Sequence, residues 1–463
     1  MNRNILLYAL LIASGLIREL SIGVKFGLSS ETNELYNLLP LGTLLSEIVI
    51  VLLAHTVAVP FYFSRLSSLR KKLGAAIAVA VLGFFVILII VGVFSLFAST
   101  AFVQSIFLFS NALSLFLVSL CSVSLPFVLL KPSLYSVPFI FYNLFQAAFF
   151  IVMLPLSGTH NILLLFGLTG LSSASLSVYA CHLWFIRHRQ FPSNRRIIFS
   201  INNMISKLLS NACASKLRSL LYLFSAFSSP VFLLLMMQYL LRICFGEGVR
   251  TSATLNYSFR LSEIPVTFFV ATILPQVYIL MSHNNSSSAG IFSVAGFANM
   301  FKALKFAYFL APFVLGFFAY LQHSSPFYYS STFSFQMIRL FGDHQHLLII
   351  ALDAIAFLLN LPAQIMLYTY SRYFYVQKKA YIVSLSFLLL APFLLFVYSS
   401  RVTINSSSFA APHLVNLAAY YFILLVISFS VPTRHQPAYL LPKTIHAVCL
   451  IALSTFSILC LLR

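Results

Sequence analysis

Apolar runs long enough to cross a lipid bilayer recur along nearly the whole 463-residue chain. Hydrophobic residues make up 60% of the chain and charged residues only 8%, whereas about a quarter of the residues in a soluble globular domain are charged. In hydrocarbon, each backbone N–H and C=O group must be satisfied within the protein, and runs of about 20 residues achieve this as helices. The sequence therefore predicts an all-α polytopic membrane protein.

The apolar runs predict thirteen transmembrane helices, with fourteen as the upper count. The predicted spans are 4–26, 35–63, 73–99, 103–130, 134–156, 161–186, 217–245, 252–282, 301–322, 345–370, 380–398, 411–432 and 443–462. They form an N-terminal lobe of six spans (1–186), a loop (187–216), a C-terminal lobe of six spans (217–432) and an additional span (433–463). The basic loop has apolar residues at helical spacing in its second half, which predicts an amphipathic helix on the cytoplasmic membrane surface.

The basic residues are distributed unevenly along these predicted spans. The chain has 28 Lys and Arg against 8 Asp and Glu, a formal net charge of +20. If the N-terminus is cytoplasmic, most of the basic residues and none of the acids fall in cytoplasmic segments, as the positive-inside rule requires. The excess charge then forms a face toward anionic lipid at the inner leaflet. We therefore expect no nucleic-acid partner.

Two predicted spans contain charged residues at membrane depth. Arg18, Glu19 and Lys25 lie in the first span, and Arg260 lies with Glu263 in the eighth. An arginine near the bilayer centre costs about 2.5–3.5 kcal/mol on insertion scales unless it faces protein, water or an anion. A guanidinium also offers the bidentate geometry that phosphate accepts. The sequence predicts that Arg18, Arg260 and Lys25 line a central cavity for a phosphate-bearing substrate.

An alternative interpretation is that each arginine pairs with a nearby acid. Arg260 and Glu263 are separated by three residues, so they lie on one helix face and could neutralise each other. Arg18 and Glu19 are adjacent, and their side chains leave a helix about 100° apart. We therefore expect Arg18 and Glu19 to pair poorly, which favours a functional role for Arg18.

Other polar residues in the predicted spans have several interpretations. Glu47 and Asp353 could each be a counter-ion, a proton carrier, a cation ligand or a buried protonated acid. Pro40 and Pro265 can bend their helices and suit gating. We expect no metal site and no cofactor beyond a coupling ion, because the only candidate cluster, Asp343, His344 and His346, lacks further ligands. The six cysteines are scattered, so we expect free thiols.

Two stretches resemble one known family. In IRELSIGVKFGLSSETNELYNLLP, the pairs Arg18-Glu19, Phe26-Gly27, Thr32-Asn33 and Leu39-Pro40 resemble the first two helices of the MurJ (MviN) family of lipid II flippases. In LNYSFRLSEIPVTFFVATILP, residues Tyr257, Arg260, Leu261 and Pro265 resemble the eighth helix of that family. Fainter similarities lie at 135–139 and 371–381. The four stretches occur in the order of the family, so the resemblance covers the chain to about residue 440.

The resemblance implies a member of the multidrug/oligosaccharidyl-lipid/polysaccharide (MOP) exporter superfamily, with two six-helix lobes related by a pseudo-two-fold axis. It implies a monomer in the bacterial inner membrane that moves an undecaprenyl-diphosphate-linked disaccharide-peptide, lipid II, to the outer leaflet by alternating access. Arg18 and Arg260 would engage the diphosphate. The implied partners are this substrate, membrane lipids and cell-wall synthesis proteins. The protein would be a transporter and not an enzyme.

The chain also departs from the family pattern. Ile12 stands where many members carry another arginine, Asn33 replaces an acid, and Ser46 and Glu47 replace a basic pair. One convincing span follows residue 433, where the family usually has two. These departures indicate a divergent member and leave the coupling residues open among Glu19, Asn33, Glu47, Glu263 and Asp353. The remaining alternatives are a flippase for another lipid-linked oligosaccharide, a small-molecule exporter, an inactive scaffold, or a polyprenyl-phosphate transferase.

Overall fold

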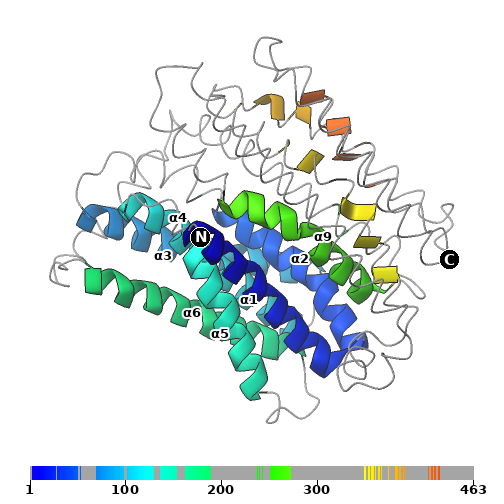
Figure 1. Cartoon of the computed structure of the whole chain (residues 1–463), viewed down its shortest axis with the longest axis horizontal. Coiled ribbons are helices and arrows are strands. Elements are labelled where there is room, and N and C mark those ends of the chain that lie inside the picture. The colour runs from blue at the N-terminus through cyan, green and yellow to red at the C-terminus, as the bar shows by residue number, and fades with distance from the viewer. Residues whose placement is uncertain are drawn as a thin grey trace. The chain divides into compact units, whose positions relative to one another are not determined.

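The computed structural model describes residues 3–27, 29–50, 69–98, 102–129, 136–153, 162–188 and 251–272, with scattered residues at 53 and between 237 and 427. Every regular element in these ranges is helical, which confirms the all-α prediction for this part of the chain (Figure 1). The long helices are α1 (Arg3–Phe26), α2 (Ser30–Ile50), α3 (Leu69–Ala98), α4 (Phe102–Leu129), α5 (Val137–Met153), α6 (Ile162–His188) and α9 (Ser252–Thr272). The other predicted spans and the 187–216 loop lie wholly or mostly outside the described residues. The count of thirteen spans therefore stays a prediction.

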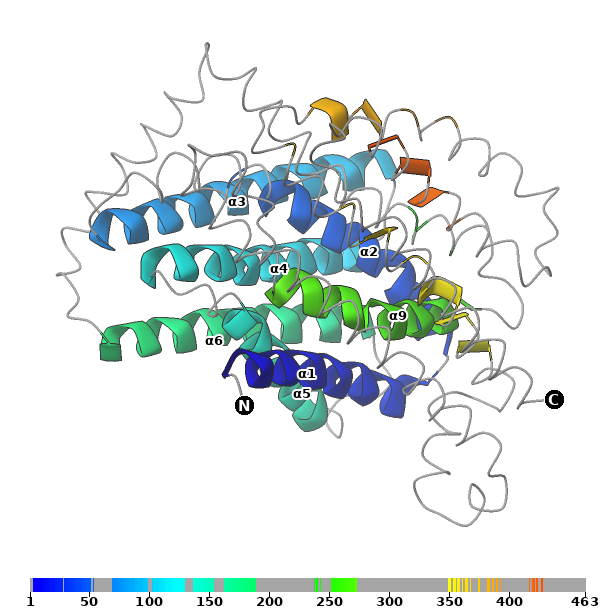
Figure 2. The same ribbon diagram turned by 45° about the horizontal axis from the view of Figure 1, so that its top comes forward.

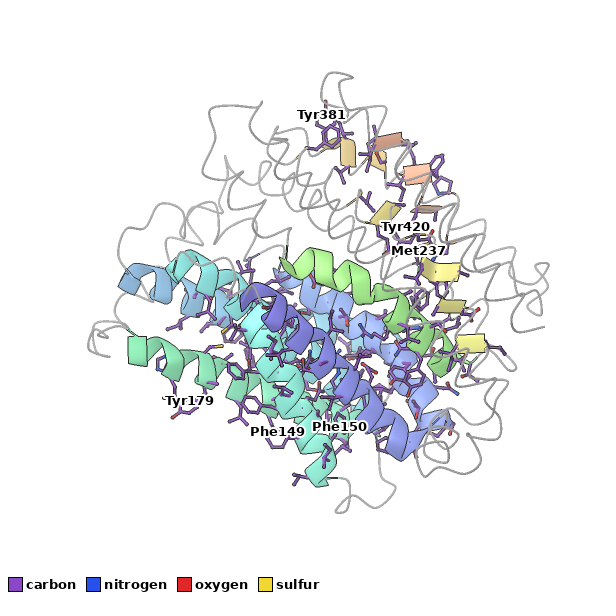
Figure 3. All side chains as sticks on the ribbon, viewed as in Figure 1. Phe149, Phe150, Tyr179, Met237, Tyr381 and Tyr420 are labelled. Atoms are coloured by element: carbon purple, nitrogen blue, oxygen red, sulfur yellow. The ribbon has the colours of Figure 1, made fainter. Side chains whose placement is uncertain are left out.

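Three of the described helices are long and apolar enough to cross a membrane. The qualifying stretches are Gly74–Leu96 in α3, Phe102–Leu125 in α4 and Ile162–Leu183 in α6, and α5 holds a shorter apolar stretch, Val137–Val152. Helix α3 exposes large apolar side chains, among them Phe85, Ile89 and Leu96. Tyr179 likewise projects from α6 away from its neighbours (Figure 3). A broad apolar surface of this kind is typical of helices that face lipid.

The chain divides into two compact units. The first comprises residues 1–22 and 38–235, and the second comprises residues 23–37 and 236–463. Helices α1 and α2 therefore each contribute residues to both units. The corner between them belongs to the same unit as the C-terminal half of the chain, a grouping that no sequence pattern indicated.

Helix α4 forms the centre of the first unit, where it packs against α3, α5 and α6 (Figure 2). Of its spanning stretch 72% is buried, against 28% for that of α3. Small residues allow the helices to approach closely. Gly83 of α3 faces the buried ring of Phe116, and Gly167 of α6 faces the Ser110 hydroxyl, so that a Cβ atom at either glycine would overlap its neighbour.

The corner between α1 and α2 has local signals that end one helix and begin the next. Gly27 has a φ of 58°, and its N–H donates to the Gly23 carbonyl at 2.9 Å. A glycine in this left-handed conformation is a common C-terminal cap because it has no Cβ to clash. Two residues later, the Ser29 hydroxyl accepts the Thr32 N–H at 3.2 Å and so caps the start of α2.

In the second unit, helix α9 packs against a helical segment that includes Ile350 and Phe357. The Ser258 hydroxyl donates to the Ile350 carbonyl at 3.1 Å, and the Phe259 ring stacks on the Phe357 ring with centroids 4.1 Å apart. Residues 252–259 of α9 are all buried. These contacts fix the helix that carries the family-like Tyr257 and Arg260 positions.

Candidate functional site

Arg18 makes a short ion pair with its neighbour in the sequence. Its Nη2 atom lies 2.7 Å from Glu19 Oε1, and the two side chains are 13% and 9% exposed. The prediction that these residues pair poorly is therefore wrong. Adjacent side chains do leave the helix about 100° apart, but the arginine stem is long enough to bring its guanidinium back to the carboxylate. The charge of Arg18 is thus locally compensated.

Two amides of α5 hold the other terminal nitrogen of Arg18. Nη1 donates to Asn143 Oδ1 at 3.2 Å and to Gln146 Oε1 at 3.5 Å. Asn143 and Gln146 are separated by three residues and therefore share one face of α5. Asn143 in turn donates through Nδ2 to the Ser14 hydroxyl at 3.4 Å. Sequence reasoning missed both amides, because an amide in an apolar span carries no sign of which helix it faces.

The polar contacts continue from Gln146 into the core of the first unit. The Tyr142 hydroxyl lies beside the Ser114 and Gln146 side chains, and all three residues are buried. A Cβ atom on Gly170 would lie 3.3 Å from the Tyr142 hydroxyl, 3.4 Å from the Ser114 hydroxyl and 3.5 Å from Gln146 Nε2. Polar contacts thus run from α1 to α5 and on to Ser114 of α4, with Gly170 of α6 packed against them.

The second unit contains a buried arginine that sequence analysis did not single out. The Arg242 side chain is 3% exposed. Its Nη1 donates to the Tyr36 carbonyl, and its Nη2 donates to Asn256 Oδ1 at 2.8 Å. Its guanidinium carbon also lies 6.0 Å from the centroid of the Phe259 ring, within cation–π range. Arg242 therefore joins the start of α2 to α9.

Pro40 explains why the Tyr36 carbonyl can accept this hydrogen bond. Pro40 lies inside α2, and proline has no N–H to donate to the carbonyl four residues earlier, which here is that of Tyr36. In a membrane span such a freed carbonyl needs another donor. Arg242 supplies it. Pro40 thus frees an acceptor that Arg242 uses, and its predicted role in gating stays a prediction.

Asn33 makes a second link between the start of α2 and α9. Its Oδ1 accepts the N–H of Ala253 at 3.0 Å, next to the local cap in which Thr251 Oγ1 accepts the N–H of Thr254 at 3.3 Å. The Tyr36 and Tyr257 rings meet edge to face, with centroids 5.6 Å apart. The residue that replaces the acid of the family pattern therefore keeps an oxygen acceptor at a helix N-terminus.

The remaining predicted site residues are divided between the two units. Arg18 and Glu47 belong to the first unit, whereas Lys25, Arg260 and Asp353 belong to the second. Glu47 on α2 is half-buried, Arg260 on α9 is partly buried, and Asp353 is fully buried.

Of the departures from the family pattern, Ser46 is buried and Ile12 is half-buried. Lys25, Glu263 and Pro265 lie in described helices, but their side chains are outside the described set, so the Arg260–Glu263 pairing stays a prediction.

The described part of the chain contains no group of three or more His, Cys, Asp or Glu residues suited to a metal ion. Asp343, His344 and His346 lie outside it. Cys121 and Cys181 are free thiols, and the other four cysteines fall outside the described residues. The site chemistry that the structure does present is that of arginines held by amides, a carboxylate and a backbone carbonyl.

Comparison with known proteins finds similarity in fold alone. No protein-family model and no curated protein matches the sequence. Among solved structures, the outward-facing conformation of a multidrug resistance MATE family transporter of the MOP superfamily has a TM-score of 0.50 at 11% identity, over 92% of this chain and 94% of that chain. A MOP superfamily transporter from Pyrococcus furiosus has a TM-score of 0.47 at 13% identity, over 92% and 94%. The eukaryotic MATE transporter AtDTX14 has a TM-score of 0.46 at 12% identity, over 97% and 95%.

The first of these structures shows a similarity of fold, and both the MOP superfamily and its MurJ branch stay predictions for this chain. The chain has a helical fold similar to that of a MATE transporter of the MOP superfamily.

Proposed function

We propose that the protein translocates a lipid-linked oligosaccharide diphosphate across the bacterial inner membrane by alternating access, with lipid II as the first candidate substrate. Two lines of support meet here. The fold is similar to that of a MOP superfamily transporter, and the motifs on α1, α2 and α9 resemble those of lipid II flippases. In this proposal the protein is a monomer with a cytoplasmic N-terminus, surrounded by membrane lipid.

The observation that carries the proposal is the environment of Arg18. Its side chain is 13% exposed, and the guanidinium contacts one carboxylate and two neutral amides. A phosphate oxygen is an acceptor of the same kind as a carboxylate oxygen, and both match the fork of a guanidinium. A phosphate oxygen can therefore bind the same guanidinium. Arg18 is thus the proposed first contact for the head group.

The remaining charges take secondary roles in the proposed cycle. Arg260 and Lys25 provide further positive charge for the diphosphate, and the polyprenyl tail stays in lipid. Pro40 and Pro265 act in gating. The candidates that balance charge or couple an ion are Glu19, Asn33, Glu47, Glu263 and Asp353. Translocation makes and breaks no covalent bond, so the proposal requires no nucleophile.

The test is complementation of a bacterium depleted of its own lipid II flippase, with accessibility of lipid II at the outer leaflet as the readout. The wild-type chain restores accessibility, whereas Arg18→Ala and Arg260→Ala do not, at equal protein level in the membrane. Arg18→Lys keeps the positive charge but loses the paired N–H donors that bind a phosphate bidentately, so it restores accessibility only in part. Ser177→Ala is a matched control: its hydroxyl donates to the Pro138 carbonyl at 2.7 Å, in the same unit but outside the contacts of Arg18. Full rescue by both arginine variants would contradict the proposal.

A second candidate function is export of a small molecule, favoured by the similarity to a multidrug resistance transporter. A third is translocation of another lipid-linked glycan. The three candidates differ in what builds up inside depleted cells. Accumulation of lipid II supports the first proposal, accumulation of a different lipid-linked glycan supports the third, and increased sensitivity to a toxic compound with neither lipid accumulating supports export.

A further inference from the structure

The two α5 amides give the Arg18 guanidinium two chemically different sides. Nη1 faces neutral acceptors, Asn143 Oδ1 at 3.2 Å and Gln146 Oε1 at 3.5 Å. Nη2 faces an anion, Glu19 Oε1, at 2.7 Å. An incoming anion competes with the Glu19 carboxylate for Nη2 as an acceptor of the same kind. The displaced carboxylate then has to turn to another donor or take up a proton, because a buried charge without a partner is costly. An anion at Nη1 would leave two buried amides unsatisfied, which is also costly.

The orientation of Asn143 is fixed by a second contact. While its Oδ1 accepts from Arg18, its Nδ2 donates to the Ser14 hydroxyl at 3.4 Å. The Ser14 hydroxyl in turn donates to the Leu11 carbonyl at 2.8 Å. Rotating the amide by 180° would place its NH₂ group against the guanidinium and its oxygen against Ser14. The donor pattern therefore selects one orientation of the amide, with its oxygen toward Arg18.

The Gln146 side chain is held by the packing around it. Its side chain is fully buried beside the Tyr142 hydroxyl, and its Nε2 lies 3.5 Å from the position of a Cβ on Gly170. Gly170 leaves room for the amide where a larger residue would crowd it. Both acceptors of Nη1 are thus held by the helix packing of the first unit, whereas Glu19 lies on the same helix as Arg18 and pairs with it.

We propose that Asn143 and Gln146 are positioning residues that orient the Arg18 guanidinium for an isoprenoid diphosphate, and that Glu19 is the counter-ion that this diphosphate displaces. The inference rests on the proposed function and names the residues that make the site specific for a phosphate-bearing isoprenoid. The fixed amides keep one edge of the guanidinium in place while its other edge exchanges partners. The site then favours ligands whose phosphate groups can replace the carboxylate over the same isoprenoid without phosphate.

The test uses the purified full-length protein in lipid nanodiscs and three probes: farnesyl diphosphate, farnesyl monophosphate and farnesol. Wild type binds the diphosphate more tightly than farnesol, and Arg18→Ala removes this preference. Asn143→Leu and Gln146→Met remove one acceptor each while keeping most of the side-chain volume. Each weakens diphosphate binding about tenfold, the effect of losing one charge-assisted hydrogen bond, and leaves farnesol binding unchanged.

Glu19→Gln should change diphosphate binding in the opposite direction from the amide variants. It removes the competing anion from Nη2, so it tightens diphosphate binding by several-fold, whereas a merely structural ion pair would give weaker binding of all probes. Ser177→Ala serves as the packing control, because it removes a hydrogen bond between α6 and α5 outside the Arg18 contacts. Its binding of all three probes stays at the wild-type level.

The outcomes separate this inference from the proposed function. If Arg18→Ala loses the diphosphate preference but Asn143→Leu and Gln146→Met keep it, the positioning role is overturned and the proposed function stands. If Glu19→Gln weakens diphosphate binding in folded protein, the displacement of Glu19 is overturned. If wild type shows no preference for the diphosphate over farnesol, the proposed function fails and the inference fails with it. Should one amide variant fail to fold, the other amide variant and Glu19→Gln still decide the question.

Discussion

The Oδ1 atom of Asn33 accepts the backbone N–H of Ala253 at 3.0 Å, although the two residues are 220 positions apart in the chain. The first turn of a helix has N–H groups without intrahelical acceptors, and side-chain oxygens normally satisfy them from the residue just before the helix. Here Thr251 does so locally, and Asn33 adds an acceptor from a distant segment. The start of α9 is therefore capped twice.

Replacement of Asn33 tests this remote cap. Asn33→Ala removes the acceptor and should lower the free energy of unfolding by about 1 kcal/mol, the usual effect of losing a cap. Asn33→Asp keeps an acceptor and adds negative charge near a helix N-terminus, so stability should be retained or rise by about 0.3–1 kcal/mol. Hydrogen exchange at the Ala253 amide is the direct measurement. Unchanged exchange in Asn33→Ala would contradict the cap.

Replacement of Arg242 tests the link between the start of α2 and α9. Arg242→Met keeps much of the side-chain length but leaves the buried Tyr36 carbonyl and Asn256 amide without this donor. We expect a loss of about 1–3 kcal/mol for each buried acceptor left unsatisfied. A double-mutant cycle with Asn256→Ala should give a coupling of at least about 0.5 kcal/mol. Additive effects in thermal unfolding would show that the two side chains act independently.

Two glycines of the same helix provide a matched pair for the packing of α3 on α4. A Cβ on Gly83 would overlap the fully buried Phe116 ring, whereas a Cβ on Gly92 would meet nothing within 4 Å. Gly83→Ala should therefore destabilise the protein by about 1–3 kcal/mol, as overpacking does. Gly92→Ala should leave stability unchanged or raise it by up to about 1 kcal/mol, because alanine favours the helix. Equal midpoints of thermal unfolding for the two variants would contradict the close approach.

The exposed apolar face of α3 should lie in lipid. The chain has one tryptophan, Trp184, so a Trp184→Phe background allows a single reporter to be introduced. Phe85 is 53% exposed on α3, whereas Phe107 on α4 is fully buried. Brominated lipid should quench the fluorescence of Phe85→Trp strongly and that of Phe107→Trp weakly. Similar quenching at both positions would show that α3 does not present this face to lipid.

The sequence predicted the described helices well because each apolar run must satisfy its own backbone hydrogen bonds in lipid. It also placed Arg18 inside the first helix. It could not predict the Arg18–Glu19 pair, because helix geometry gives the direction of a Cβ atom and not the reach of a long side chain. Asn143, Gln146 and Arg242 were missed for another reason. Their roles depend on which helices are neighbours, and spacing along one helix carries no such information.

Pro40 and Arg242 have a joint consequence for how this chain can change in evolution. Pro40→Ala would return an N–H to α2 and give the Tyr36 carbonyl a partner within its own helix. The Arg242 side chain would then no longer be needed as the donor to the Tyr36 carbonyl. Arg242→Leu or Arg242→Met would therefore lower the free energy of unfolding less than in the present chain. The two positions form an epistatic pair. A related sequence that lacks the proline is therefore expected to tolerate an apolar residue at the position of the arginine.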